Sequence, residues 1–211
     1  MIRILVVDDH RVFASSLARV LAAEPDIEVV GAVHTAEGAM GAMHDGVDVV
    51  LIDFRLGNTD GIDVTRRLVA EWPDVRVVML TASHDEAVMA AALEAGCSGF
   101  ITKSESLEVV LIAVRGAAVG ESVISPALLG RLLPRLTSRA RGRNPDLTQR
   151  EHEVLSLMAL GGSNQDIADE LMISRDTVRN HVASILSKMG VNSKLQAVTA
   201  GIQRGLISVT P

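Results

Sequence analysis

The chain has 211 residues, of which 48% are hydrophobic and 2% aromatic, so it can bury a sizeable core built from aliphatic side chains. A single cysteine, Cys97, excludes an internal disulfide framework and a cysteine-based zinc site. The net charge of −6 is unevenly spread along the chain. Residues 1–125 carry 9 Lys and Arg against 19 Asp and Glu, residues 126–146 carry 5 against 1, and residues 147–211 carry 6 against 6. An acidic first part, a basic middle part and a neutral last part indicate different functions for the three.

Residues 1–122 alternate between short apolar runs and amphipathic segments. The apolar runs, which predict strands, are residues 2–7, 27–32, 47–52, 75–80 and 99–102. The amphipathic segments, which predict helices, lie near residues 11–23, 36–43, 61–71, 85–95 and 106–118. Most runs are rich in Val, Ile and Leu with little alternation, as in parallel strands that are covered on both faces. The pattern predicts an α/β fold with a doubly wound, five-stranded parallel sheet.

Residues 123–146 interrupt this alternation. The first part predicts one short helix between Pro126 and Pro134. The second part, RLTSRARGRNPD, is basic and typical of a flexible linker. We expect a solvated spacer between two domains, with contacts of its arginines to the acidic first domain as an alternative.

Residues 147–211 carry only helical patterns. Thr148 with Glu151 three residues later is a capping-box pattern. Further helices are predicted to start at Ser163, Ser174 and Ser193. Helix ends are predicted at Gly161-Gly162, Gly190 and Gly205. Four short helices with a tight turn at residues 172–174 predict an all-α helix-turn-helix domain.

Polar side chains stand where the predicted strands end. Asp8 and Asp9 follow the first strand, Asp53 the third, Thr81 the fourth, and Lys103 lies just after the fifth. Ligands bind at the carboxyl ends of strands in such sheets, so we expect these groups on one rim. Carboxylates packed together repel unless a cation neutralises them, and oxygen ligands with several waters suit Mg²⁺. The sequence predicts a magnesium site where one carboxylate can attack a phosphoryl group that Lys103 and Thr81 contact.

A simpler interpretation is that each aspartate only caps a helix or a turn at the end of its strand. Any one of Asp8, Asp9 and Asp53 alone would fit that role. Their combination with Thr81 and Lys103 at matching strand ends favours the magnesium site instead.

With these five residues, positions 1–120 resemble the receiver domain of response regulators. The resemblance implies a flavodoxin-like strand order 2-1-3-4-5 and phosphorylation of Asp53 by a sensor histidine kinase. It further implies that Mg²⁺ is bound by Asp9, Asp53 and the backbone carbonyl of Arg55, with Asp8 acting through water. The mobile aromatic residue of the family corresponds to Phe100, which lacks a tyrosine hydroxyl, so that only rotation of its ring remains.

The predicted helix over residues 175–189 has two distinct faces. Apolar residues recur at helical spacing and predict a buried stripe: Val178, Val182, Ile185 and Met189. The other face offers candidate DNA contacts at Arg179, Asn180, Ala183, Ser184 and Ser187. Arg and Asn suit bidentate contacts to guanine and adenine. Phosphate contacts are expected near helix ends, from Arg175, Lys188 and Lys194. A generic polar helix surface is the alternative.

Residues 147–208 resemble the four-helix DNA-binding domain of the LuxR/FixJ/NarL type. The matching stretches are LTQREHEVL, GGSNQDIADELMIS, TVRNHVASILSKMGV and SKLQAV. The resemblance implies that Arg179, Asn180 and Ala183 face the major groove of double-stranded DNA. Because this domain has no positive excess, we expect modest affinity of the monomer and binding as a homodimer to paired half-sites. The linker arginines could assist at DNA phosphates.

The two resemblances imply a phosphorylation-dependent transcription regulator of a two-component system. A phosphoryl group adds a charge of about −1.5 to −2, which would draw Thr81 and Lys103 toward it and turn Phe100 inward. We expect domains at 1–122 and 147–211 joined by a linker at 123–146, a cytoplasmic location and no membrane partner. We expect no enzymatic turnover beyond self-phosphorylation and slow self-dephosphorylation.

Two other functions remain open from the sequence. One is a constitutive DNA binder in which the first domain is a dimerisation scaffold. The other is a metal-dependent phosphohydrolase with an aspartyl-phosphate intermediate, although such enzymes usually carry a second acid two residues after the nucleophile, where this chain has Arg55.

Overall fold

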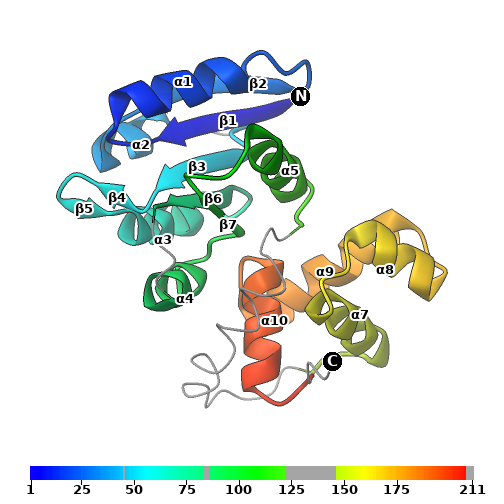
Figure 1. The fold of residues 1–211 in the computed structure, drawn as a ribbon. Coiled ribbons are helices and arrows are strands. Elements are labelled where there is room, and N and C mark those ends of the chain that lie inside the picture. The colour runs from blue at the N-terminus through cyan, green and yellow to red at the C-terminus, as the bar shows by residue number, and fades with distance from the viewer. Residues whose placement is uncertain (45, 83–85, 122–145, 208–211) are drawn as a thin grey trace. The chain divides into compact units, whose positions relative to one another are not determined.

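The computed structural model describes residues 1–44, 46–82, 86–121 and 146–207 (Figure 1). The chain divides into two compact units, and the division falls within residues 122–145. The predicted linker, with its helix between Pro126 and Pro134, therefore lies outside the described residues except for Asp146. Within the described ranges, every helix is too short or too polar to cross a membrane.

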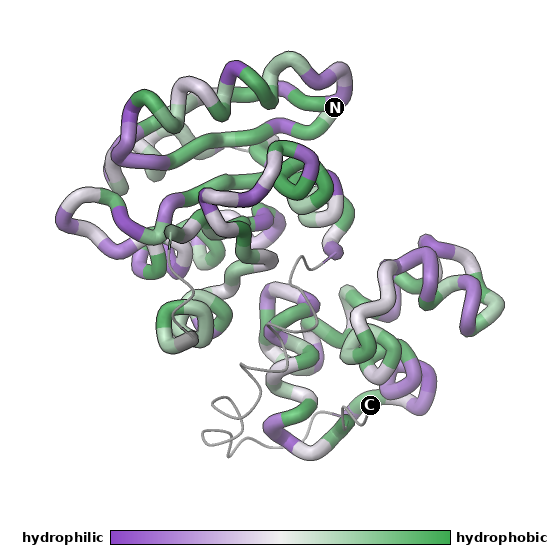
Figure 2. The backbone as a smooth tube through the Cα atoms, in the orientation of Figure 1, coloured by the Kyte–Doolittle hydropathy of each residue, from purple (hydrophilic) through white to green (hydrophobic). Residues whose placement is uncertain are grey.

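The first unit is built on a parallel sheet. Its strands are β1 (Ile2–Val7), β2 (Ile27–Val33), β3 (Val49–Asp53), β6 (Arg76–Thr81) and β7 (Gly99–Thr102). The order across the sheet is β2-β1-β3-β6-β7, and each neighbouring pair is parallel. Figure 2 shows these strands as largely hydrophobic segments. The predicted doubly wound sheet of order 2-1-3-4-5 is confirmed.

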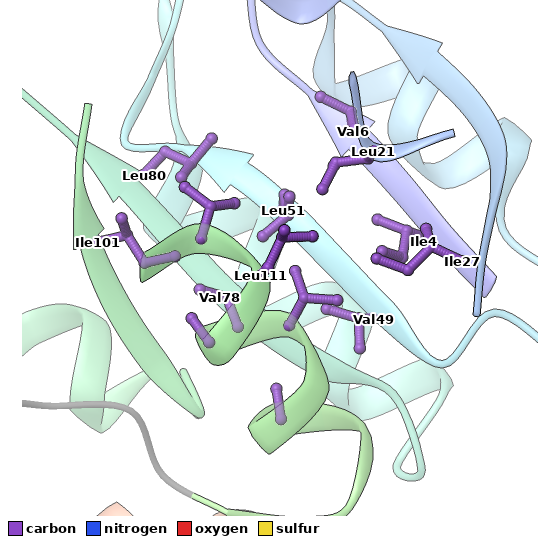
Figure 3. Packing of buried hydrophobic residues seen from close by; sticks show 14 of the residues in the cluster. Ile4, Val6, Leu21, Ile27, Val49, Leu51, Val78, Leu80, Ile101 and Leu111 are labelled. Carbon is purple, nitrogen blue, oxygen red and sulfur yellow. The ribbon is translucent and has the colours of Figure 1, made fainter. Parts of the chain in front are cut away.

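Helices pack against both faces of the sheet. They are α1 (Arg11–Leu21), α2 (Ala36–Ala42), α3 (Gly61–Glu71), α4 (Glu86–Glu94) and α5 (Leu107–Ala118). One buried cluster joins Leu21 of α1 and Leu111 of α5 to strand residues such as Leu51 (Figure 3). α3 packs against both α2 and α4. The aliphatic core fixes the strand ends, and through them the side chains that follow.

A short hairpin between β3 and α3 was not predicted. It pairs β4 (Arg55–Leu56) with β5 (Thr59–Asp60) in antiparallel fashion. Two-residue strands are too short to show an alternating pattern, which is why the sequence does not reveal them. The turn residue Gly57 has a φ of 63° and donates its N–H to Asp9 Oδ2 at 2.9 Å. The hairpin thereby reaches the rim of the sheet.

The second unit is helical in its described part, as predicted. Its helices are α7 (Gln149–Ala159), α8 (Asn164–Leu171), α9 (Arg175–Met189) and α10 (Lys194–Gln203). The capping box of Thr148 and Glu151 is present, and Ser163 forms a second one with Asp166. The predicted stripe of α9 is buried, at Val178, Val182, Ile185 and Met189. The helix-turn-helix prediction is confirmed.

Candidate functional site

Acidic side chains from β1 and β3 meet one lysine at the carboxyl rim of the sheet. Lys103 Nζ lies 2.7 Å from Asp8 Oδ2 and 2.7 Å from Asp53 Oδ2. Asp8 is fully buried and Asp53 is 4% exposed, while the Asp9 side chain is 30% exposed. The structure therefore brings together the three aspartates and the lysine that the sequence placed at separate strand ends.

The backbone around Asp53 is held by the start of α3. Gly61 donates its N–H to the Phe54 carbonyl at 2.8 Å, and Thr65 Oγ1 donates to the Gly61 carbonyl at 2.8 Å. A Cβ at Gly61 would lie against the Asp53 carbonyl oxygen, far inside van der Waals contact. Only glycine permits this approach, so α3 fixes where the Asp53 carboxylate stands.

The charges at this rim do not balance among the described residues. Burial raises the pKa of Asp53 above its usual value, and the neighbouring Asp8 adds to the rise, while the Lys103 hydrogen bond opposes it. Burial alone would lower the pKa of Lys103, but hydrogen bonds to Asp53 and Asp8 raise it. One ammonium is thus shared between two buried carboxylates with Asp9 beside them, which favours binding of a further cation.

Two more predicted residues, Arg55 and Thr81, lie at the same pocket. A cavity of about 480 Å³ is lined by Asp53, Arg55, Thr81 and Lys103, among others. Thr81 is 2% exposed at the end of β6. Phe100 on β7 is 8% exposed, so its ring is already buried in this structure. The predicted inward turn of the ring on phosphorylation would therefore start from a buried position and not from solvent.

His10 also belongs to this cluster, although the sequence pattern did not identify it. Its Nδ1 lies 2.8 Å from Asp9 Oδ1, 3.3 Å from Asp8 Oδ1 and 3.9 Å from Asp53 Oδ2. The only signal in the sequence is its position directly after Asp9.

These four side chains fit a divalent cation. Asp8, Asp9, His10 and Asp53 each offer one ligand atom, and these atoms lie within 4.8 Å of one another. Asp9 Oδ1 is a buried oxygen to which no described residue donates a hydrogen bond of suitable geometry, although His10 Nδ1 lies 2.8 Å away. An oxygen-rich, partly open pocket of this kind matches the ligand preference of Mg²⁺.

The outer face of α9 presents polar side chains to solvent. Most predicted contact residues are exposed there: Arg175, Arg179, Asn180, Ala183 and Ser187. Asp176, with a side chain that is 84% exposed, accepts a hydrogen bond from Arg179 at 3.1 Å. The face opposite the buried stripe is therefore accessible to a partner.

Three other predicted DNA contacts are already engaged or buried. Ser184 Oγ donates to Glu151 Oε1 at 2.5 Å, and Lys188 Nζ donates to Glu151 Oε2 at 2.7 Å. Lys194 is 5% exposed. The helical wheel places Ser184 on the outer face, and Lys188 was predicted from its place near the helix end. Neither argument can show that a buried carboxylate on α7 needs donors from α9. Contacts of these residues to DNA would compete with the interactions seen here.

Family models match both units. The response regulator receiver domain matches residues 4–115, which is more than half of the chain. The luxR family of bacterial regulatory proteins matches residues 145–200. These matches coincide with the parallel sheet that carries the acidic cluster and with α7, α8 and α9.

Two relatives match this chain along nearly its whole length. The transcriptional regulatory protein LiaR of Bacillus subtilis is 35% identical over 211 residues, covering 99% of this chain and 100% of LiaR. The response regulator VraR of Staphylococcus aureus is 36% identical over 207 residues, covering 98% and 99%.

Solved structures agree with the fold. The response regulator ChrA, from a heme-sensing two-component system, is 34% identical with a TM-score of 0.52, covering 98% of each chain. RcsB of Salmonella typhimurium is 22% identical with a TM-score of 0.57, covering 94% of this chain and 98% of RcsB. The chain therefore belongs to the response regulators with a receiver domain and a LuxR-type DNA-binding domain, and is a phosphorylation-dependent transcription regulator of a two-component system.

Proposed function

We propose that Asp53 accepts the phosphoryl group from a sensor histidine kinase, in a reaction that requires Mg²⁺. The observation that carries this proposal is the buried meeting of Asp53, Asp8 and Lys103 at the rim, where one ammonium serves two carboxylates. Asp8, Asp9, Asp53 and the Arg55 carbonyl would hold the cation. The receiver would span residues 1–122, the linker 123–146 and the DNA-binding domain 147–211.

In the transfer step, a carboxylate oxygen of Asp53 attacks the phosphorus of a phosphohistidine. The new O–P bond forms as the P–N bond breaks, and the electron pair returns to the imidazole of the kinase. When bound, Mg²⁺ would neutralise phosphoryl oxygens and so lower the repulsion between them and the carboxylate. Lys103 supplies a second positive charge and Thr81 a hydroxyl donor, both at the wall of the same cavity.

Phosphorylation would change how Lys103 is shared. In the structure its ammonium contacts Asp8 and Asp53 equally closely. Three phosphoryl oxygens on Asp53 would compete for that ammonium and for Thr81. This displaces the loops after β6 and β7, and it shifts the population toward a form that binds DNA.

On DNA, we propose that α9 enters the major groove and that a homodimer occupies paired half-sites. Arg179, Asn180 and Ala183 would face base edges, and Arg175 and Ser187 would lie nearby. Ser184, Lys188 and Lys194 would contribute only if they leave their present surroundings. These steps take place in the cytoplasm, without a membrane partner.

Intact-mass measurement tests the chemistry. Incubation with acetyl phosphate and Mg²⁺ should add one phosphate to the chain, and Asp53→Asn should add none. A gel shift on the protein's own promoter should then show tighter binding of the phosphorylated form, with the Asp53→Asn variant unresponsive. Identical DNA affinity for both forms would instead favour a constitutive binder, and sustained release of phosphate from small phosphomonoesters would favour a phosphohydrolase.

A further inference from the structure

Phe13 of α1 lies against the lysine of the phosphorylation pocket. The Lys103 ammonium stands over the Phe13 ring, with Nζ 4.9 Å from the ring centroid. We propose that Phe13 is a positioning residue, whose ring holds the Lys103 ammonium at Asp53 and away from a second cavity beside the pocket. This inference rests on the proposed role of Lys103 in phosphorylation and adds the residue that fixes where its charge stands.

The charge of Lys103 has partners of two kinds. Its Nζ lies 2.7 Å from one oxygen of Asp8 and 2.7 Å from one oxygen of Asp53. The lysine side chain is 17% exposed, so water has little access to the ammonium. An ammonium is attracted to the negative face of an aromatic ring, and the attraction is stronger where water is excluded. Phe13 thus adds to the attraction of the carboxylates without occupying their oxygens.

A second cavity adjoins the phosphorylation pocket. It has a volume of about 320 Å³ and is lined by residues of α1 and α5, such as Leu17 and Val110, and by Glu105 of the loop after β7. Among the described residues, Phe13 and Lys103 alone line both this cavity and the phosphorylation pocket. The pair therefore forms the wall between the two spaces.

Glu105 is a competing partner for the lysine. Its side chain lines the second cavity, and the residue is exposed. A lysine has a flexible stem and a compact charge, so it can reach several acceptors unless its surroundings restrict it. Without the Phe13 ring, the two cavities join, and the ammonium can turn from Asp53 toward the Glu105 carboxylate. The ring thus prevents a competing ion pair as well as attracting the charge.

A packing role alone is the other explanation for Phe13. The residue is partly buried and packs against the aliphatic core of the first unit. Leucine would keep most of that packing, whereas only an aromatic ring offers its face to a cation. The two roles therefore predict different results for Phe13→Leu and Phe13→Tyr.

Phosphate incorporation from acetyl phosphate with Mg²⁺, followed by intact mass on the full chain, gives the first test. We expect Phe13→Leu to slow it about 3- to 10-fold, because less positive charge then stands at Asp53. Phe13→Tyr should keep the wild-type rate, since it keeps the ring. Adding Glu105→Gln to Phe13→Leu should restore part of the rate, because the competing acceptor loses its charge. Trp72→Leu, which removes a ring at the end of α3 outside both cavities, is the matched control and should match the wild type.

Nuclear magnetic resonance reports the position of Lys103 itself. The chain has three lysines, so ¹³C-lysine labelling gives three sets of side-chain signals, and Lys103→Arg identifies the set from Lys103. The ring current of Phe13 should shift the Lys103 Hε resonance upfield in the wild type and in Phe13→Tyr. This shift should be lost in Phe13→Leu, while the signals of Lys188 and Lys194 stay unchanged. Phe13→Met, which also lacks a ring, repeats both measurements if leucine disturbs the fold.

The outcomes separate this inference from the proposed function. The inference is overturned if Phe13→Leu keeps the wild-type rate, if it keeps the upfield Lys103 signal, or if Phe13→Tyr is as slow as Phe13→Leu. No gain in rate from Glu105→Gln overturns the role of the second cavity. The proposed function stands in each case if the wild type takes up one phosphate and Asp53→Asn takes up none. If the wild type takes up no phosphate, the proposed function fails, while the resonance comparison still decides whether the ring holds Lys103.

Discussion

Two buried carboxylates, one in each unit, have pKa values that are shifted in opposite directions. Asp53 is 4% exposed and Glu151 is 3% exposed, and each has a lysine Nζ at 2.7 Å. The pKa of Asp53 is raised, chiefly by burial. Burial acts on Glu151 in the same direction, but hydrogen bonds from Lys188, Ser184 and Thr148 lower its pKa to about 2.

Besides burial, the supply of hydrogen-bond donors separates the two carboxylates. Lys103 is shared between Asp53 and Asp8, whereas Glu151 receives Lys188, Ser184 Oγ and the Thr148 N–H at 2.6 Å. Asp53, with a shared lysine and one backbone hydrogen bond at Arg55, keeps a tendency to bind a cation or a phosphoryl group. A carboxylate with full hydrogen bonding instead fixes two helices against each other. The comparison predicts functional losses from changes around Asp53 and stability losses from changes around Glu151.

The largest effect should come from Gly61→Ala. The new Cβ would collide with the Asp53 carbonyl, so β3 and the start of α3 must separate and the carboxylate moves away from Lys103. Misplacement of a reacting group by about 1 Å can slow a reaction about 100-fold. We expect a loss of that order in the rate of phosphate incorporation from acetyl phosphate, measured by intact mass.

Gly41→Ala is the matched control for this change. Gly41 lies in α2 with open space where its Cβ would stand, so alanine should be tolerated and even favoured in the helix. Its phosphorylation rate should equal that of the wild type. A Gly61→Ala variant that is phosphorylated at the wild-type rate would show that the close approach of α3 does not position Asp53.

The next largest effect should come from Glu151→Gln. The amide keeps the shape but loses the charge that accepts hydrogen bonds from Lys188 and Ser184 across α7 and α9. We expect a loss of about 1–3 kcal/mol in the free energy of unfolding of the helical unit. Hydrogen exchange, followed by mass spectrometry of peptides from α7 and α9, measures it. Glu153→Gln, whose side chain is 38% exposed, should change it by about 0.5 kcal/mol or less.

The stabilisation by Glu151 should depend on pH in a defined window. Its pKa is lowered from 4.5 to about 2 in the folded protein, so the stabilisation is complete above pH 4.5 and is lost as the pH falls toward about 2. The difference in unfolding temperature between wild type and Glu151→Gln should therefore be constant from pH 7 to 5 and shrink below. A difference that does not change down to pH 2 would contradict a lowered pKa.

The sequence predicts what depends on repeated patterns. The strands were found because residues such as Val49 and Leu51 belong to runs buried on both faces. The meeting of Asp8, Asp53 and Lys103 followed because parallel strands end at one rim. The features that the sequence did not predict depend on single contacts between elements that are far apart in the chain. The bond from Ser184 to Glu151 joins residues 33 positions apart and exists only because α7 and α9 cross there.

The smallest effect tests local backbone strain in the helical unit. Met172, at the end of α8, has φ 53° and ψ 45°, a left-handed conformation that costs a non-glycine residue about 1–2 kcal/mol. Its side chain loses no packing when removed, because the residue is 91% exposed. Met172→Gly removes the strain but gains flexibility in the unfolded chain, so we expect a net stabilisation of about 0.5–1 kcal/mol in thermal unfolding. Met172→Ala keeps the Cβ and should give none. If alanine stabilises as much as glycine, the gain comes from removing the exposed thioether rather than from relief of the backbone, and the unit holds no strain at this turn.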